Sequence, residues 1–398
     1  MDSFDWLSSG IKIDVLPAGE VQRPRRVALV HDWLTTYVGG ERVLEQMISV
    51  FPEASIFSSI DVVPDHERAF LGGREPITSF AQNWPFMRKH YRTFLPLLMF
   101  AIEQLDVSQS ELVLSSSASI GKGILTGPDQ LHIAYVHSPM RYAWDMQHQY
   151  LRDAGIATGL RGLLARWILH RARIWDLRTA NGVDHFIANS KFIARRIKKV
   201  YRRDATVIYP PVDIEQFAFR EQKDDFYLIV SRMVPYKKIP KIVEAFRELP
   251  DDRLVVIGDG TEMARVKDLA GKNVEIIGYQ GSAVVRNYMQ RAKAFVFAAE
   301  EDFGISLVEA QACGTPVIAF GRGGALESIR GIDHERPTGL FFHEQSAHSI
   351  AEAVREFDRC SDRFSPLDCR ANASRFSIDT FKNAYRTFVE DAWKAFVG

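Results

Sequence analysis

One stretch in the second half of the chain decides the fold. Residues 294–320 read AFVFAAEEDFGISLVEAQACGTPVIAF. The apolar run at the start is typical of a buried strand, and the segment after the charged loop has a helical pattern. Gly314-Thr315-Pro316 then turns the chain into a second apolar strand. A strand, a helix and a strand in this order predict two parallel strands of one sheet, joined by a crossover helix.

The same alternation extends through both halves of the chain, whose 398 residues favour two domains. Two prolines at 210–211 and a polar run at 221–225 mark a linker, residues 209–225. We therefore expect an α/β protein of two Rossmann-like domains, residues 27–208 and 226–376, that face each other across a cleft. The expected strands lie at 27–31, 112–114, 132–136 and 185–188, and at 226–230, 253–257, 274–277, 294–298 and 316–320.

Both ends of the chain lie outside these domains. Residues 1–26 show no clear element and are interpreted as an N-terminal extension. Residues 377–398 have an amphipathic helical pattern that Ser377 can cap, and this helix can pack back on the N-terminal domain.

The composition excludes several classes of protein. Apolar residues make up 46% and charged residues 25%, and the formal net charge is zero, which argues against a nucleic-acid binder. The three cysteines match neither a disulfide framework nor a metal template. Residues 1–20 do not resemble a signal peptide, and no run of about 20 apolar residues occurs, so we expect a cytoplasmic protein.

The loop inside the opening stretch carries chemistry. A helix that begins near Gly304 exposes free backbone N–H groups, which attract an anion such as phosphate. Glu301 at the loop edge and Glu309 in the helix suit sugar and ribose hydroxyls, because carboxylate oxygens accept hydrogen bonds. Taken alone, two such glutamates are more simply interpreted as capping or solvent-facing acids.

Their context resembles a known family. Glu301 and Glu309 are separated by seven residues and followed by a Gly-Thr-Pro turn. This pattern is similar to the signature of the retaining, GT-B-fold glycosyltransferases of family 4. The amino-acid sequence of the stretch looks most like that of the bacterial mannosyltransferase branch that builds surface polysaccharides. The resemblance extends over nearly the whole chain after residue 26. It implies transfer of a sugar, first of all mannose from GDP-mannose, to a polysaccharide or a lipid-linked oligosaccharide.

The resemblance also implies roles for the residues of this loop. Glu301 would position the donor sugar and take part in catalysis, and Glu309 would bind the ribose. Phe303, Gly304 and Ile305 would complete the donor-binding loop.

A second segment, Ser231 to Lys238, follows an expected strand and precedes a helix. In the family an Arg and a Lys at this spacing grip the nucleotide diphosphate, which implies that role for Arg232 and Lys237. A guanidinium fork and a point charge that converge on a pyrophosphate need no metal. Lys238 stands where the family commonly has glycine, and it would replace Lys237 if the register shifts by one. The alternative is a solvated basic turn.

Further donor contacts are implied at two glycine turns and one aromatic residue. Gly258 lies in a strand-to-glycine turn near the nucleotide, and Tyr279 lies where the main chain meets the base. Gly39 and Gly40 match the family's glycine loop beside the sugar diphosphate; geometry alone can also require a glycine in a tight turn.

The N-terminal half supplies the expected acceptor side. His137 matches a family histidine near the transferred sugar, where an imidazole can hydrogen-bond a hydroxyl or polarise the reacting centre. A packed structural histidine is the alternative. Asp32 and Tyr37 flank the glycine loop and are expected to contact the acceptor, as is Arg141.

No Asp-x-Asp motif occurs in the chain. Metal-dependent GT-A enzymes use that pair to hold a divalent ion on the diphosphate. We therefore expect no metal and no other cofactor, with cationic side chains and a helix N-terminus acting in the metal's place.

Two stretches have the composition of a lipid-binding surface. Residues 84–100 place basic and aromatic residues before an apolar run, and residues 160–178 interleave arginines with aliphatic and aromatic residues. The second stretch lies in a wider region, residues 151–203, that carries thirteen Lys and Arg against three Asp. Such a mixture suits an anionic bilayer, so we expect a peripheral protein on the inner face of the membrane. The alternative is a core helix with a solvated arginine face.

Other functions stay open at this point. The donor could be a UDP-sugar. A phosphorylase or synthase of the same fold would share the two glutamates, and a GT-B epimerase fits the branch less well. From another class, a non-catalytic sugar-nucleotide-binding subunit is possible, although intact Glu301, Arg232 and Lys237 argue against it.

Overall fold

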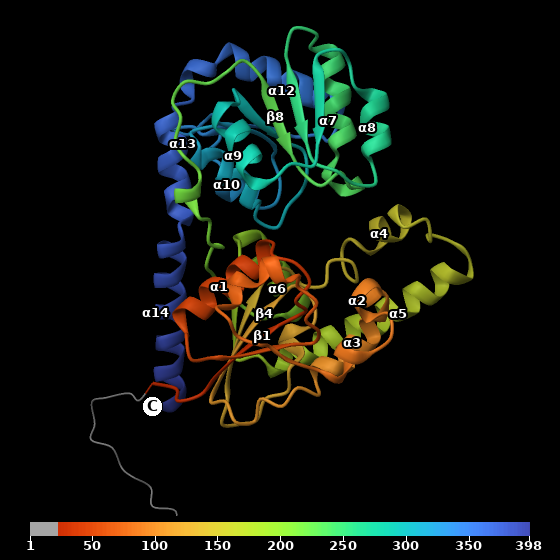
Figure 1. The fold of residues 1–398 in the computed structure, drawn as a ribbon, viewed down its shortest axis with the longest axis vertical. Coiled ribbons are helices and arrows are strands. Elements are labelled where there is room, and N and C mark those ends of the chain that lie inside the picture. The colour runs from red at the N-terminus through yellow and green to blue at the C-terminus, as the bar shows by residue number, and fades with distance from the viewer. Residues whose placement is uncertain (1–22) are drawn as a thin grey trace, which may run out of the picture.

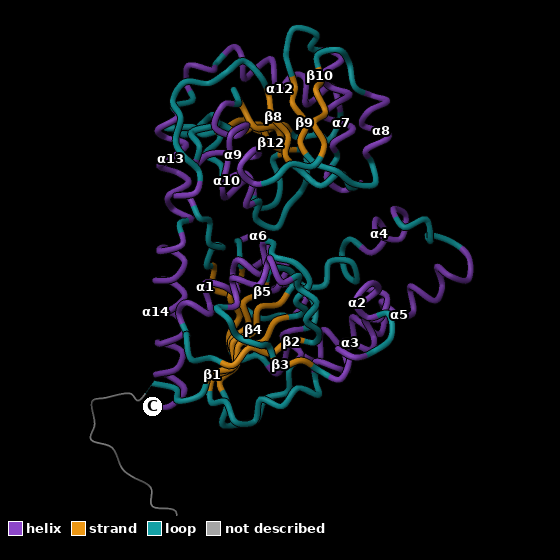
Figure 2. Tube along the Cα trace, viewed as in Figure 1, coloured by secondary structure: helices purple, strands orange, loops and turns teal. Residues whose placement is uncertain are grey.

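The computed structural model describes residues 23–398, so most of the expected N-terminal extension lies outside the described residues. The described residues form two parallel sheets, of seven and six strands. In each half the strands lie at the centre and the helices outside them (Figures 1 and 2). The prediction of two Rossmann-like α/β domains is confirmed.

The first sheet has the order β3-β2-β1-β4-β5-β6-β7. Its central strands β4 and β5 are buried along their whole length, as the inner strands of parallel sheets are. The order reverses where β1 lies beside β4. The strands are β1 (Val27–His31), β2 (Ser55–Ser58), β3 (Ile77–Thr78), β4 (Leu112–Ser117), β5 (Leu131–Val136), β6 (His185–Ala188) and β7 (Ala205–Val207).

The second sheet has the order β10-β9-β8-β11-β12-β13, and here the order reverses where β8 lies beside β11. The residues quoted at the start of the sequence analysis, 294–320, form β11, α10 and β12. Strands β11 and β12 pair in parallel, so the predicted strand–helix–strand crossover is confirmed. The strands are β8 (Tyr227–Val230), β9 (Leu254–Ile257), β10 (Val274–Gly278), β11 (Ala294–Phe297), β12 (Val317–Phe320) and β13 (Gly339–Phe342).

Four strands, β2, β3, β7 and β13, were missed by the sequence analysis. Each has only two to four residues; β3, β7 and β13 are edge strands, and β2 lies next to an edge. Such short segments show too little periodicity to predict a strand. The helices are α1 (Gly39–Val50), α2 (Met87–His90), α3 (Leu95–Ile102), α4 (Gln147–Asp153), α5 (Gly159–Thr179), α6 (Lys191–Tyr201), α7 (Ile239–Ala245), α8 (Met263–Leu269), α9 (Ser282–Arg291), α10 (Ile305–Ala312), α11 (Ala325–Ser328), α12 (Ala347–Arg359), α13 (Pro366–Ala373) and α14 (Ile378–Val397).

The last helix, α14, returns to the first domain. Phe381, Tyr385 and Trp393 pack in the core cluster that contains Leu29 of β1. The Ser377 hydroxyl accepts a hydrogen bond from the Thr380 N–H at 3.2 Å and caps the helix. In Figure 1 this helix, in blue, runs along the first domain and continues from the second.

Helices α4 and α5 form an arm, residues 147–179, that projects sideways from the first domain (Figure 1). The C-terminal half of α5 is anchored, since Ala172 and Asp176 are buried. One face of α5 exposes an apolar stripe of Leu160, Leu163, Leu164, Trp167 and Ile174. No helix in residues 23–398 combines the length and the apolar character that crossing a bilayer requires.

Candidate active site

The carboxyl edge of the second sheet holds the residues expected to bind the donor. The loop after β8 carries Arg232 and Lys237, and the loop after β11 carries Glu301. Because β8 and β11 are neighbours at the point where the strand order reverses, the two loops meet there. This is the position at which doubly wound sheets bind ligands.

The two expected phosphate-binding cations differ in their surroundings. Lys237 Nζ forms an ion pair with Glu301 Oε1, and it lies 5.4 Å from the ring centroids of Tyr236 and Phe297. The Arg232 side chain is exposed and has no hydrogen-bond or ion-pair partner among the described residues. Lys237 is therefore held in place, while the Arg232 guanidinium has all its donors available for an anion.

The residue after Lys237 has an unusual backbone. Lys238 adopts φ +58° and ψ +25°, the left-handed region, directly before α7. That conformation costs a non-glycine residue about 1–2 kcal/mol. The chain thus keeps at Lys238 the backbone turn for which glycine is the favoured residue.

The loop after β11 is fixed by its main chain and one aromatic ring. Gly304 adopts φ +89° and precedes α10. Phe303 is buried, with ring centroids 5.6 Å from Tyr209 and 5.2 Å from Phe376. The Phe303 ring thus packs in the core and anchors the loop. The Ile305 Cδ1 lies 3.3 Å from where a Cβ on Gly39 of the first domain would stand.

Close approach of two backbones explains the glycines of this edge. A Cβ on Gly258 would lie 1.9 Å from the Ser231 carbonyl oxygen, and a Cβ on Gly324 would lie 2.3 Å from the Phe303 Cα. These glycines let the loops with Arg232 and Glu301 pack against neighbouring turns. Packing thus requires a glycine at position 258, whether or not this residue contacts a nucleotide. Tyr279, the other expected donor contact of this edge, has a side chain that is 81% exposed.

The carboxyl edge of the first sheet faces this site. His31 ends β1 and pairs in register with Ser116 of β4, and His137 follows β5. Ser116 Oγ lies 2.8 Å from His137 Nε2. Burial, with a smaller contribution from the positive charge of His31, lowers the pKa of His137 to about 3. The His137 imidazole is therefore neutral at physiological pH.

The Asp32 carboxylate has a structural role in the first domain. It is buried and accepts hydrogen bonds from the N–H groups of Ala118 at 2.6 Å and Ile120 at 2.8 Å, and from Ser117 Oγ at 3.1 Å. Its oxygens fix the loop after β4. The expected contact of Asp32 with the acceptor stays a prediction.

Tyr37 and Arg141, the other residues expected to contact the acceptor, stand on opposite sides of the edge. The Tyr37 hydroxyl donates to Glu45 at 2.7 Å, which fixes the ring direction. The Arg141 guanidinium lies 5.5 Å from the Tyr236 ring centroid and 3.3 Å from the Asp302 carboxylate. Arg141 therefore already reaches across to the second domain.

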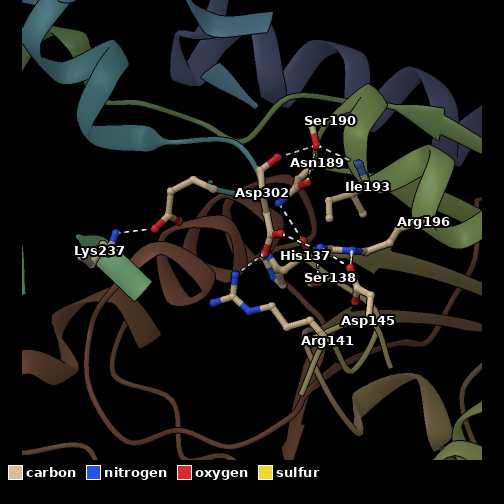
Figure 3. A network of polar contacts seen from close by, with 11 residues as sticks. His137, Ser138, Arg141, Asp145, Asn189, Ser190, Ile193, Arg196, Lys237 and Asp302 are labelled. Carbon is tan, nitrogen blue, oxygen red and sulfur yellow. Dashed lines mark hydrogen bonds and ion pairs between the residues drawn. The ribbon is translucent and has the colours of Figure 1, made fainter. Parts of the chain in front are cut away.

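Asp302 links the two domains (Figure 3). Arg141 Nη1 and Arg196 Nη1 donate to its carboxylate, the second at 2.9 Å, and Ser190 Oγ donates to its main-chain oxygen at 2.6 Å. Asn189 Nδ2 donates to the His137 carbonyl at 2.9 Å. The loop that carries Glu301 is thus tied to the strand ends that carry His137.

Two more residues of the second domain, Glu309 and Glu327, contact the first domain. Arg42 Nη1 of α1 donates to Glu309 Oε1 of α10 at 2.6 Å. Glu327 of α11 accepts the main-chain N–H groups of Lys191 at 2.7 Å and Phe192 at 2.9 Å, so it caps the start of α6 in the other domain. Glu309, expected to bind a ribose, holds an arginine of the first domain in this structure.

Comparison with protein-family models covers most of the chain. Residues 38–216 match the model of Glycosyltransferase Family 4, and residues 212–375 match that of the Glycosyl transferases group 1. The chain is a GT-B glycosyltransferase.

Among its relatives, this glycosyltransferase is 28% identical over 252 residues to an uncharacterized glycosyltransferase of Methanocaldococcus jannaschii, covering 61% of the chain and 70% of the relative. It is 28% identical over 205 residues to a GDP-mannose-dependent monoacylated alpha-(1-6)-phosphatidylinositol monomannoside mannosyltransferase of Corynebacterium glutamicum. That match covers 44% of the chain and 52% of the relative. A D-inositol 3-phosphate glycosyltransferase of Mycobacterium leprae is 26% identical, with 55% of the chain and 58% of the relative covered.

Solved structures share the fold at low identity. Anabaena HepE in complex with UDP and glucose has a TM-score of 0.66 at 16% identity, covering 92% of this chain and all of that one. The sucrose-phosphate synthase of Thermosynechococcus elongatus has a TM-score of 0.69 at 17% identity, covering 93% and 99%. These likenesses establish the GT-B fold of the glycosyltransferase.

Several residues at the cleft were not singled out by the sequence analysis. Arg42, Arg196 and Glu327 join the two domains, and each is one charged residue among many on a helix. Asp302 was quoted only as part of the loop, although it stands next to Glu301. His31 ends an apolar run directly before the glycine loop, and this position is the one signal that could have marked it.

Proposed function

We propose that this glycosyltransferase moves a hexose, with retention of configuration, from a nucleotide sugar to a glycan or lipid-linked acceptor. The observation that carries the proposal is the edge where Arg232 and Lys237 lie beside Glu301, opposite His137. In the reaction the acceptor hydroxyl oxygen bonds to the anomeric carbon while the bond between that carbon and the diphosphate breaks. The electron pair of the broken bond leaves with the diphosphate, which takes up the hydroxyl proton. Arg232 and Lys237 would stabilise the charge that develops there, so no divalent metal is required.

Mannose from GDP-mannose is the first candidate donor. The sequence branch supports it, and so does the printed name of the Corynebacterium glutamicum relative, which is GDP-mannose-dependent. A UDP-sugar is the second candidate, favoured by structures of the same fold that hold UDP. A non-catalytic sugar-nucleotide-binding subunit would keep the same donor edge without transfer.

The arm supports a lipid-linked acceptor. Its exposed stripe places Trp167 and Leu163 among arginines on the domain that carries the expected acceptor side, and Phe86 of the neighbouring aromatic run is 76% exposed. Basic and apolar side chains together favour an anionic bilayer surface. We therefore propose a peripheral enzyme on the inner face of the membrane.

One experiment tests the donor and the metal together. Thermal unfolding is measured with a panel of GDP- and UDP-sugars, with and without EDTA, and the stabilising donor is then assayed for transfer to a lipid-extract acceptor. Stabilisation by one nucleotide sugar and EDTA-resistant transfer support the proposal. Loss of all transfer in EDTA, restored by Mg²⁺ or Mn²⁺, would contradict metal independence. A donor that binds but is neither transferred nor hydrolysed would favour the non-catalytic subunit.

A further inference from the structure

A buried ion pair lies beneath the glycine loop of the first domain. His31 Nε2 lies 3.6 Å from Glu41 Oε1, and the side chains are 6% and 7% exposed. Glu41 is the third residue of α1, and its Oε2 accepts the Val38 N–H at 3.2 Å. The carboxylate therefore closes the start of the helix on one side and holds the imidazole on the other.

The His31 and His137 rings approach the same glycine. A Cβ on Gly40 would lie 3.6 Å from His31 Cε1 and 3.8 Å from His137 Nε2. Ser116, the register partner of His31, contacts His137 Nε2. Two imidazoles, a carboxylate and a hydroxyl thus form one cluster at the carboxyl ends of β1, β4 and β5.

Glu41 creates an electrostatic problem at this position. A carboxylate in the first turn of α1 places a negative charge next to the edge that an anionic donor must approach. The same charge favours protonation of the nearby His137. A positive charge on His31, whose Nε2 lies 3.6 Å from the Glu41 carboxylate, offsets both effects.

The surroundings of His31 favour that positive charge. Burial lowers the pKa of His31, but the hydrogen bond and charge of Glu41 outweigh it, with smaller contributions from Asp32 and the Ser116 main chain, so that this pKa lies above its ordinary value. Of these neighbours, Glu41 belongs to α1, Asp32 follows β1 and Ser116 belongs to β4. His137, after β5, also faces the cluster, and the Tyr135 ring of β5 packs against it with the centroids 5.2 Å apart.

We propose that His31 is a positioning residue, whose ion pair with Glu41 offsets the negative charge at the start of α1 and so, together with burial, holds the His137 imidazole neutral in acidic solution for contact with the transferred sugar. This inference rests on the proposed function only for the contact with sugar. The charge balance of the cluster is a property of the folded protein without ligand.

The test compares three variants of the full chain by imidazole NMR titration, with His137 assigned by its own variant. In the wild type His137 stays neutral at pH 5. His31→Asn leaves Glu41 uncompensated, so the titration midpoint of His137 moves up by about 1–3 pH units. Glu41→Gln keeps a cap acceptor and removes both charges, so His137 moves little. The double variant His31→Asn/Glu41→Gln returns His137 close to its wild-type midpoint.

The pH profile of kcat supplies the functional readout. We expect its acid limb to move upward in His31→Asn by the same amount as the NMR midpoint, and to return in the double variant, while KM for the donor at neutral pH changes less. A merely structural His31 would lower kcat at every pH without moving the limb, and that result overturns the proposal.

If the His31→Asn protein does not fold, a second measurement on Glu41→Gln tests the proposal. In Glu41→Gln the midpoint of His31 itself falls below its wild-type value, because its partner charge is gone. An unchanged His31 midpoint overturns the proposal. If the His137 midpoint moves as expected but the wild-type protein has no transferase activity, the charge balance is supported and the proposed function is contradicted.

Discussion

The carboxyl edges of the two sheets are built in different ways. At the second sheet the loops pack backbone against backbone, with glycine at the closest approaches, and Arg232 is exposed while Lys237 is held by Glu301. At the first sheet buried side chains from three strand ends form the floor, and a Cβ on Gly40 of the loop above them would make only ordinary contacts. The second-domain side of the cleft therefore depends on main-chain geometry and two cations, and the first-domain side depends on a cluster of buried side chains.

The largest expected effect is at the two cations of the second edge. Lys237→Ala and Arg232→Ala should each raise the barrier to transfer by about 2–4 kcal/mol, because under the proposed function each removes a charged contact to the leaving diphosphate. Steady-state kinetics with saturating donor measure this loss, and thermal unfolding measures the fold.

Lys241→Ala is the matched control, since Lys241 lies on α7 and pairs with Glu244 at 2.8 Å. It should keep wild-type turnover. Near wild-type rates for both Lys237→Ala and Arg232→Ala would remove the diphosphate assignment.

Glycine substitutions compare the two edges directly. Gly324→Ala forces a Cβ to within 2.3 Å of the Phe303 Cα. Because that atom belongs to the main chain, relieving the clash requires a backbone shift, and we expect the free energy of unfolding to fall by about 1–3 kcal/mol. Gly40→Ala meets its nearest atom at 3.6 Å, an ordinary contact, and should fold as the wild type does. Denaturant unfolding of both variants checks the contrast, and equal stabilities would show that the second edge tolerates backbone shifts.

Gly40→Ala also tests the first edge as a binding surface. The variant should be stable yet transfer more slowly if the loop lies against the sugar diphosphate. Full activity of a stable Gly40→Ala protein would limit the glycine to a role in folding.

The arm offers a third comparison, since it belongs to the first domain alone. The protein should sediment with anionic liposomes at low salt and be released at high salt. Arg171→Glu should weaken this binding by about 1–2 kcal/mol, because each basic residue near an anionic surface contributes about 1 kcal/mol. Arg171 is the better position than Arg166, whose guanidinium donates to the Ala157 carbonyl at 2.5 Å and holds the start of α5.

Arg359→Glu, at an exposed position on α12 of the second domain, is the control and should bind liposomes as the wild type does. Wild-type protein that stays in the supernatant at low salt would instead favour a soluble acceptor.

The smallest expected effect concerns Lys238. Lys238→Gly should stabilise the protein by about 1 kcal/mol, because glycine adopts the left-handed conformation without strain. Its transfer rate should stay close to that of the wild type, since Lys237 is the cation paired with Glu301. A large loss of rate in Lys238→Gly would move the diphosphate contact from Lys237 to Lys238.

Local pattern in the sequence determined the two α/β domains and the positions of the main loops. A buried strand, a glycine turn and a helix are each decided by residues next to one another, so residues 294–320 predict their own βαβ unit. The same locality placed Arg232, Lys237 and Glu301 after strand ends, where parallel sheets bind ligands.

Only the tertiary structure decided which side chains meet across the cleft. Arg42 and Glu309 are 267 residues apart, and Arg141 and Asp302 are 161 apart, so no local pattern links them. It also decided burial: Asp32 is turned inward by loop amides, while the stripe on α5 is left exposed. The physical reason is that periodicity reports the neighbours of a residue along its own strand or helix, whereas burial and ion pairing depend on which other element the fold brings against it.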